Sequence, residues 1–314
     1  MTFTAILAGV LLLLLMLVDV FLTVFHPTAH AGPLTRLQSR VVWRLTRLIG
    51  GCGRRRSDRI LSLGGPAIAA LTPIAWVVLL VTGFSLIHWP FVLSFAFEPG
   101  RPGPRWIEAL YYSGYLATTL GLGDVIPSHG PQRLVAITEA VLGFGLFSVG
   151  ITYVLSIYSQ QSVQTALATT IDHALRDAPP IDWRYPEPQQ LEWAASLARD
   201  VAGQLARVNT ANRQYPILHY FRHPRSGEAL VVQVGRLIRW IRDMEAARPE
   251  RDWFSAPSPF VSMRRSLEDY LSEVPIHVVP GGNGRRGIDW DDQHRRLLCY
   301  LCYDNVPAAA TAGP

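Results

Sequence analysis

The sequence contains no lysine, few charged residues and only three cysteines. All 29 basic residues are arginine, which we attribute to genomic composition bias and which indicates nothing about mechanism. Charged residues make up 17% of the 314 residues, whereas a soluble protein has about a quarter. Three cysteines are too few for a disulfide framework. The shortage of charge makes membrane-spanning segments the first feature to look for.

Three apolar segments are long enough to cross a bilayer, which takes about 20 residues. They run from Phe3 to Phe25, from Pro66 to Trp89 and from Leu134 to Tyr158. A fourth segment, Trp106 to Ala117, has helical character but is too short to span. Although Ala29 and Ala31 form an A-x-A pattern behind the first segment, its apolar core is too long for a signal peptide. We therefore expect three membrane spans.

The distribution of arginine predicts how the spans are oriented. The loop 26–65 has eight arginines and one acid, whereas the connection between the second and third spans is balanced. Short loops rich in arginine remain on the cytoplasmic side. The N-terminus and residues 91–133 are then expected outside, and the tail after Tyr158 in the cytoplasm.

The same loop has the pattern of an amphipathic helix. An apolar stripe lies beside one basic helical face, which is formed by Arg36, Arg40, Arg44 and Arg47. This pattern is typical of a helix that lies in the membrane interface and contacts anionic lipid. A voltage-sensor helix would need a longer apolar span around its arginines, so we favour the interfacial helix.

The stretch "ATTLGLGDVIP" places polar, flexible residues between a short helix and a spanning helix. Non-helical backbone at membrane depth occurs only where protein buries it or where it lines water. Glycine at alternate positions permits left-handed conformations, which would turn successive carbonyl oxygens toward one axis. Four such strands form oxygen rings that can replace the water shell of a potassium ion. The backbone from Thr119 to Gly123 is the predicted lining, and the Thr119 hydroxyl can add a further ring.

Several segments resemble the pore-loop potassium channels, specifically the bacterial type with two transmembrane helices. "TTLGLGD" is similar to their filter pattern T-x-G-x-G-D. "EALYYSGYLATTLGLGDVIP" and "QRLVAITEAVLGFG" resemble their pore helix, filter and inner helix. The likeness covers about residues 66–158.

This resemblance implies a homotetramer, because one chain carries one filter. It implies potassium sites at Thr119, Leu120, Gly121 and Leu122, with Gly123 closing the filter. Gly143 is then the hinge of the inner helix, and Tyr111 and Tyr112 belong to an aromatic cuff around the filter.

Two positions depart from the family pattern. Leu122 replaces the usual filter tyrosine or phenylalanine, so the hydrogen bond from that ring to the cuff cannot form. A weakly selective cation channel therefore remains an alternative to a potassium-selective one. Tyr115 replaces the glutamate that some relatives place behind the filter, and we expect its hydroxyl to donate to Asp124.

Two acids lie inside predicted spans, where ionisable residues usually face protein or water. Glu139 is either a brace or proton sensor behind the filter, or a structural hydrogen-bond partner of the pore helix. Asp19 is a candidate partner for an interfacial arginine.

A possible gate lies on the third span beyond Gly143. Phe147, Ile151 and Leu155 recur at helical spacing and could form a hydrophobic constriction that closes by dewetting. Any packed helix would show the same stripe, so both interpretations stay open.

The tail favours a compact all-α domain. The third span is expected to continue as helix to Asp177, and further helical patterns cover 188–212, 227–247, 259–274 and 289–303. "GNGRRG" at 282–287 fits a loop better than a dinucleotide site, since only 27 residues follow it. Cys299 and Cys302 form one C-x-x-C pattern, whose redox or metal role the sequence leaves open.

The prediction is an all-α membrane protein: a helix–pore-loop–helix tetrameric cation channel with an extra N-terminal transmembrane helix and an all-α cytoplasmic domain. Its segments are 1–25, 26–65, 66–158 and 159–314. We expect a bacterial inner-membrane channel that is not an enzyme and takes no cofactor beyond the permeant potassium. A non-conducting membrane receptor or scaffold is the alternative from another functional class.

Overall fold

The computed structural model describes residues 2–26, 31–50, 60, 62–97, 103–221, 229–247, 253 and 258–273. The chain divides into two compact units. The N-terminal unit comprises residues 1–42 and 67–157, and the C-terminal unit comprises 43–66 and 158–314. Each unit is described by itself.

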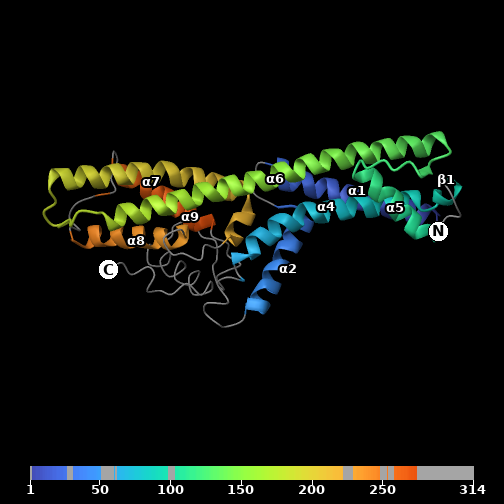
Figure 1. Ribbon diagram of the computed structural model, residues 1–314. Helices are drawn as coiled ribbons and strands as arrows, with labels where there is room; N and C mark the ends of the chain where they lie inside the picture. The colour runs from blue at the N-terminus through green and yellow to red at the C-terminus, as the bar shows by residue number, and fades with distance from the viewer. Residues whose placement is uncertain are drawn as a thin grey trace. The chain divides into compact units, whose positions relative to one another are not determined.

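The N-terminal unit is built from membrane-length helices and a short pore helix (Figure 1). Three helices are long and apolar enough to span a bilayer: α1 (Thr2–Val20) with the π-helical turn η1 (Phe21–Phe25), α4 (Gly64–His88) and α6 (Gly130–Arg176). The remaining elements are the turn η2 (Val92–Ser94), the short helix α5 (Arg105–Ala117) and the first part of the amphipathic helix α2 (Pro33–Gly50). From residue 43 onward, α2 belongs to the C-terminal unit. Two short strands, β1 (Ala96–Phe97) and β2 (Val125–Ile126), pair antiparallel with Ala96 opposite Ile126.

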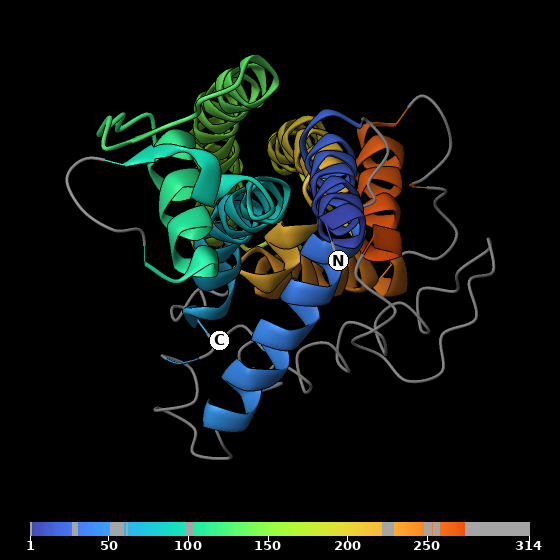
Figure 2. The ribbon, with the colours of Figure 1, turned by 90° about the vertical axis from the view of Figure 1, so that its right-hand side faces the viewer.

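Helices α1 and α4 approach each other closely at two glycines. A Cβ atom on Gly9 would lie 2.5 Å from the carbonyl oxygen of Gly83. Because glycine has no side chain, the two backbones can pack together at a distance that a larger residue would prevent. Figure 2 views this unit nearly along α1, and α2 turns away from the end of α1 in both views.

All the secondary-structure elements that the structure describes in the C-terminal unit are helices or 3₁₀ turns. This unit contains the end of α6, then α7 (Pro188–Gln214), the 3₁₀ turn η3 (Pro216–Tyr220), α8 (Leu230–Ala247) and α9 (Pro259–Glu273). Helix α7 begins at a capping box in which the side chains of Glu187 and Gln190 satisfy each other's backbone N–H groups. Its buried residues recur every three or four positions, so one face of α7 is apolar.

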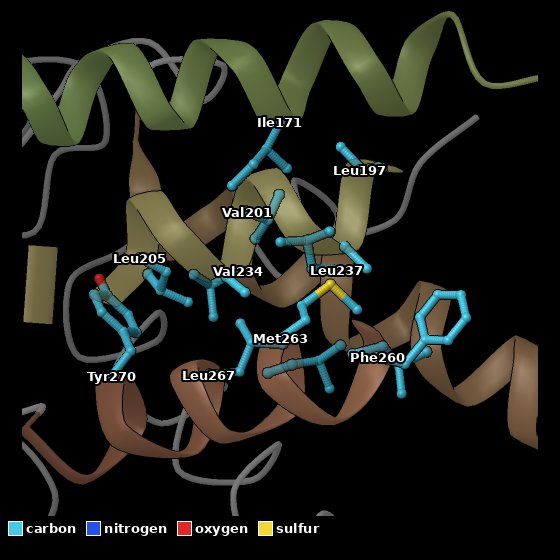
Figure 3. Close-up of a cluster of buried hydrophobic side chains, with 14 of the residues drawn as sticks. Ile171, Leu197, Val201, Leu205, Val234, Leu237, Phe260, Met263, Leu267 and Tyr270 are labelled. Carbon is cyan, nitrogen blue, oxygen red and sulfur yellow. The ribbon is translucent and has the colours of Figure 1, made fainter. Parts of the chain in front are cut away.

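The core of this unit contains residues from four helices, whose side chains point toward one another in Figure 3. They are Ile171 from α6; Leu197, Val201 and Leu205 from α7; Val234 and Leu237 from α8; and Phe260, Met263, Leu267 and Tyr270 from α9. Leu167 and Ala168 of α6 are also fully buried in this core.

A buried carboxylate fixes the end of α6 to α8. Asp172 accepts hydrogen bonds from the Arg236 guanidinium at 2.5 Å and from the Gln233 amide at 3.4 Å, and Arg176 pairs with its other oxygen at 2.8 Å. The last turns of the inner helix are therefore an integral part of the C-terminal unit.

The expected helices agree with the structure to within a few residues wherever the residues are described. The three long apolar helices, the short helix expected at 106–117 and the continuation of the third span toward Asp177 are confirmed. The short β1–β2 pair was not predicted. The expected helix at 289–303, the loop 282–287 and both Cys299 and Cys302 lie outside the described residues.

The burial of side chains along α6 predicts that alanine substitutions one turn apart have different effects on the stability of the C-terminal unit. Leu167→Ala should destabilise the C-terminal unit by about 2–5 kcal/mol, because it opens a cavity in the core. Val163→Ala, one turn earlier on the same helix at a partly exposed site, is the matched control and should change little. Thermal unfolding of the purified protein measures both, and equal melting temperatures would contradict this assignment of the core.

Candidate ion pathway

The pore helix α5 ends where the non-helical segment begins. The Thr118 hydroxyl donates back to the Gly114 carbonyl at 2.9 Å, and the Thr118 backbone N–H donates to the same carbonyl at 3.2 Å. The backbone N–H groups of Thr119 and Leu120 donate to the carbonyls of Leu116 and Tyr115, both at 2.9 Å. These bonds join the start of the segment to the last turn of α5.

Alternate residues of the segment adopt left-handed backbone conformations. The φ angles are 57° at Thr119, 58° at Gly121 and 79° at Gly123. Such a conformation is ordinary for glycine, but in threonine it costs about 1–2 kcal/mol. Thr119 is the only described residue other than glycine with a positive φ. Its strained backbone is held by the hydrogen bonds from the end of α5.

Two tyrosines of α5 hold the segment beyond Gly123. The Tyr111 hydroxyl donates to Asp124 Oδ2 at 2.7 Å, and the Tyr115 hydroxyl donates to the Val125 carbonyl at 2.7 Å. The expectation that Tyr115 would donate to Asp124 is therefore wrong. Tyr111 lies one helical turn before Tyr115 and supplies that bond instead.

Tyr112 is the centre of an aromatic cluster behind the pore helix. Its ring meets those of His88 and Phe95 edge-on, with centroids 4.9 Å and 5.2 Å away, and also contacts the ring of Tyr115. Tyr112 is fully buried, whereas Tyr111 is partly exposed. Of the two predicted cuff tyrosines, one is therefore a packing residue and the other a hydrogen-bond donor.

Glu139 of α6 connects all three helices of the pore module. Its carboxylate lies 3.0 Å from His88 Nε2 of α4 and accepts a hydrogen bond from the Ser113 hydroxyl of α5. Ser113 is also within 2.9 Å of the Val81 carbonyl of α4. Glu139, His88 and Ser113 are all buried. The geometry places Glu139 against the pore helix, and His88 is its second partner.

Sequence reasoning missed His88 and Ser113. The signal that could have identified them is a polar residue inside a mainly apolar stretch: His88 in "SLIHWP" and Ser113 in "LYYSGYL". Such residues need a buried partner, but the sequence does not say which of several acids or carbonyls supplies it.

Gly143 lies directly against the C-terminal end of the pore helix. A Cβ atom at this position would overlap the Ala117 carbonyl oxygen and lie 2.8 Å from Ala117 Cα. Helix α6 continues unbroken through this point. The glycine predicted as a hinge is thus also the residue that lets the inner helix contact the backbone immediately before Thr118.

The candidate gate residues Phe147, Ile151 and Leu155 are exposed on α6. They border an apolar groove of about 450 Å³ between α6 and α4, whose α4 wall is Pro73, Ile74, Val77 and Val78. None of the described residues of the single chain covers these side chains, which is compatible with pore lining and with contact to another subunit.

Asp19 contacts the beginning of α2 and none of the arginines whose side chains the structure describes. Its carboxylate accepts hydrogen bonds from the backbone N–H groups of Leu34 and Thr35 and from the side chains of Thr35 and Trp76. The expected pairing with an interfacial arginine is therefore wrong for Arg36, Arg40 and Arg44. Arg36, Arg40 and Arg44 are exposed on α2, and the side chain of Arg47 lies outside the described part of the chain.

Comparisons with known proteins agree with this arrangement. Residues 73–160 match the family model described as an ion channel. The chain is also 27% identical over 272 residues to YdjJ of Bacillus subtilis, described as an uncharacterized membrane protein, with 86% of this chain and 77% of that protein covered. No solved structure matches the chain. The chain is thus an all-α membrane protein whose residues 73–160 are similar to an ion channel family.

The contact between Gly143 and Ala117 predicts a position-specific effect on α6. Gly143→Ala should destabilise the protein by about 1–3 kcal/mol and reduce its ion flux, because the backbone of Ala117 cannot yield as a flexible side chain would. Gly145→Ala is the control, since a Cβ there meets no atom within 4 Å. Thermal unfolding and flux assays on both variants test this; equal behaviour would contradict it.

The contacts of Glu139 predict that its hydrogen bonds contribute more to the stability of the protein than its charge does. Glu139→Leu leaves the buried His88 ring without its partner and should cost about 1–3 kcal/mol. Glu139→Gln keeps the size and an acceptor oxygen, so it should cost less than half as much. The melting temperatures of the two purified variants decide between these effects, and a larger loss for the glutamine variant would refute the brace.

Proposed function

We propose that this ion channel domain conducts potassium passively, in a homotetramer whose selectivity filter is the backbone from Thr119 to Gly123. The observation that carries the proposal is the alternation of left-handed residues at Thr119, Gly121 and Gly123. When right-handed and left-handed residues alternate, successive carbonyl groups turn toward the same side of the chain. A row of carbonyl oxygens is the ligand set that replaces the water around a potassium ion.

The tetramer follows from the number of filter segments. One chain provides one row of oxygens, and only a ring of rows can surround an ion. Apolar side chains are also exposed in the single chain, both in the segment at Leu120 and Leu122 and along α6 at Leu134, Ile137, Val141, Phe144, Ile151 and Leu155. Contact with neighbouring subunits and lipid would cover such a surface.

In this proposal the potassium sites are at Thr119, Leu120, Gly121 and Leu122. The bonds from Tyr111 to Asp124 and from Tyr115 to Val125 support the outer end of the filter. These two bonds hold the residues that directly follow the filter. Leu122 lacks the aromatic ring that tethers the filter in the family pattern, and the bonds lie just after that position in the chain. This support favours a selective filter in spite of Leu122.

Weak selectivity is the second candidate, and Leu122 is the observation that favours it. Its side chain is half-exposed and has no hydrogen-bonding group. Sodium would pass as well if the Tyr111–Asp124 bond does not hold the rings of carbonyl oxygens at the spacing that suits a potassium ion.

Glu139 and Tyr112 brace the filter from behind, and α6 carries the movable part of the pore. Gly143 would be the hinge, and at least one of Phe147, Ile151 and Leu155 would line the gate. Since conduction is passive, the protein is not an enzyme in this proposal and needs no cofactor beyond the permeant ion.

The arginine distribution supports an orientation with the N-terminus outside and the C-terminal unit in the cytoplasm. The similarity to a Bacillus subtilis membrane protein supports a bacterial inner (plasma) membrane as the location. In that orientation α2 lies at the cytoplasmic interface. Its exposed arginines at positions 36, 40 and 44, together with Arg47, would contact anionic lipid headgroups.

Reversal potentials test the proposal. Purified protein in a planar bilayer, with potassium on one side and sodium on the other, should show a strongly shifted reversal potential. Gly121→Ala or Gly123→Ala should abolish the selective current, because alanine is strained at their positive φ angles. Gly203→Ala on α7 is the control, since a Cβ there has open space and Ala favours helix.

A reversal potential near zero would replace this proposal with the weakly selective channel. A selective current that survives both filter substitutions would show that ions take another path.

A further inference from the structure

A buried carboxylate at the end of α1 joins three helices of the N-terminal unit. Asp19 Oδ1 accepts the backbone N–H groups of Leu34 at 2.8 Å and Thr35 at 3.2 Å. Asp19 Oδ2 accepts the Thr35 hydroxyl at 2.6 Å and the Trp76 indole N–H at 2.9 Å. The carboxyl group is completely buried. One side chain of α1 therefore holds both the first turn of α2 and the middle of α4.

The contact with α2 is a helix cap supplied by another helix. The first turn of a helix has N–H groups without intrahelical partners, and its positive dipole end favours an anion. Asp19 fills this place for α2, and the Gly32 N–H donates to the Thr23 hydroxyl beside it at 2.9 Å. A Cβ on Gly32 would overlap the Asp19 carboxyl group. The start of α2 is therefore fixed relative to α1.

The rest of α2 presents a surface suited to a lipid membrane. Its exposed apolar residues are Leu37, Val41, Leu45, Leu48 and Ile49, and beside them lie the exposed arginines 36, 40 and 44. An amphipathic helix with a cationic face matches the charge and the apolar layer of a bilayer that contains anionic lipid. This matching identifies the partner as the anionic membrane surface.

The contact with α4 continues to the inner helix. The Trp76 ring, which donates to Asp19, packs on the Tyr153 ring of α6 with centroids 5.5 Å apart. Both rings are buried. Tyr153 lies between the candidate gate residues Ile151 and Leu155. A continuous set of buried contacts thus connects the start of α2 with the part of α6 where the pore would close.

We propose that α2 senses anionic lipid, and that Asp19 and Trp76 carry its position to Tyr153 on the inner helix. The inference rests on the proposed channel function. When arginines of α2 bind headgroups, the helix is held in the interface; because Asp19 fixes its first turn, that constraint acts on Trp76 and through it on α6. Asp19 and Trp76 are positioning residues and touch neither the ion nor the lipid.

The test compares potassium flux through the purified full-length protein in two kinds of vesicle. One contains phosphatidylcholine alone, and the other contains about one-third phosphatidylglycerol, enough to create a negative surface. For the unmodified protein, the fluxes in the two kinds of vesicle should differ by a factor of about five or more. A factor of about five is the lower end of typical allosteric coupling.

Three variants separate lipid binding from its transmission. The triple variant Arg36→Gln, Arg40→Gln, Arg44→Gln should bring the flux ratio close to one. Trp76→Phe keeps a ring against Tyr153 but removes the donor to Asp19, and should reduce the ratio in the same way. Asp19→Asn should also reduce the flux ratio. If the Asp19→Asn protein does not assemble, Trp76→Phe alone provides the test of transmission. Arg199→Gln with Arg207→Gln, at exposed sites on α7, is the matched control and should keep the ratio.

The outcomes distinguish the two proposals. An absence of potassium flux from both kinds of vesicle overturns the proposed function. Flux that is equal in both kinds of vesicle overturns lipid sensing while the channel function stands. A lipid response that persists in Trp76→Phe and Asp19→Asn overturns transmission through this contact.

Discussion

The non-helical backbone between Thr118 and Gly123 is the constraint on which the N-terminal unit depends. At membrane depth, backbone polar groups without partners are costly, so such a segment must be held by protein or line water. Its N-terminal end is bonded to the last turn of α5, and its C-terminal end is held by Tyr111 and Tyr115. Gly143 then allows α6 to contact the end of α5. The helices around the segment serve to keep it in one conformation.

Buried carboxylates fix the remaining helix contacts. Glu139 joins α6 to α4 and α5, Asp19 joins α1 to α2 and α4, and Asp172 joins α6 to α8. Each is buried, and each is paired with donors from more than one segment. Such groups are expensive to bury unless their hydrogen bonds are satisfied. They therefore specify where helices meet, whereas apolar contacts between spans would allow several arrangements.

The sequence predicted the helices well and their polar contacts poorly. Apolar length identified α1, α4 and α6, and the glycine spacing in "TTLGLGD" predicted the alternating conformations at Gly121 and Gly123. Partners of single polar residues could not be read in the same way. Tyr111 and Tyr115 share one helix face and lie one turn apart, so which of them reaches Asp124 depends on a shift of about one turn along the helix axis. Asp19 likewise accepts hydrogen bonds from backbone N–H groups, because the chain comes back against it at Gly32. The hydrophobic pattern of the sequence does not predict this close approach.

The most direct test of the ion pathway is a crystal structure of the purified protein grown in potassium and then soaked in thallium, whose ion is a heavy analogue of potassium. The account predicts anomalous peaks on a fourfold axis, surrounded by carbonyl oxygens of Thr119 to Gly123 from four chains. Chains that do not share such an axis, or thallium bound away from this segment, would contradict it.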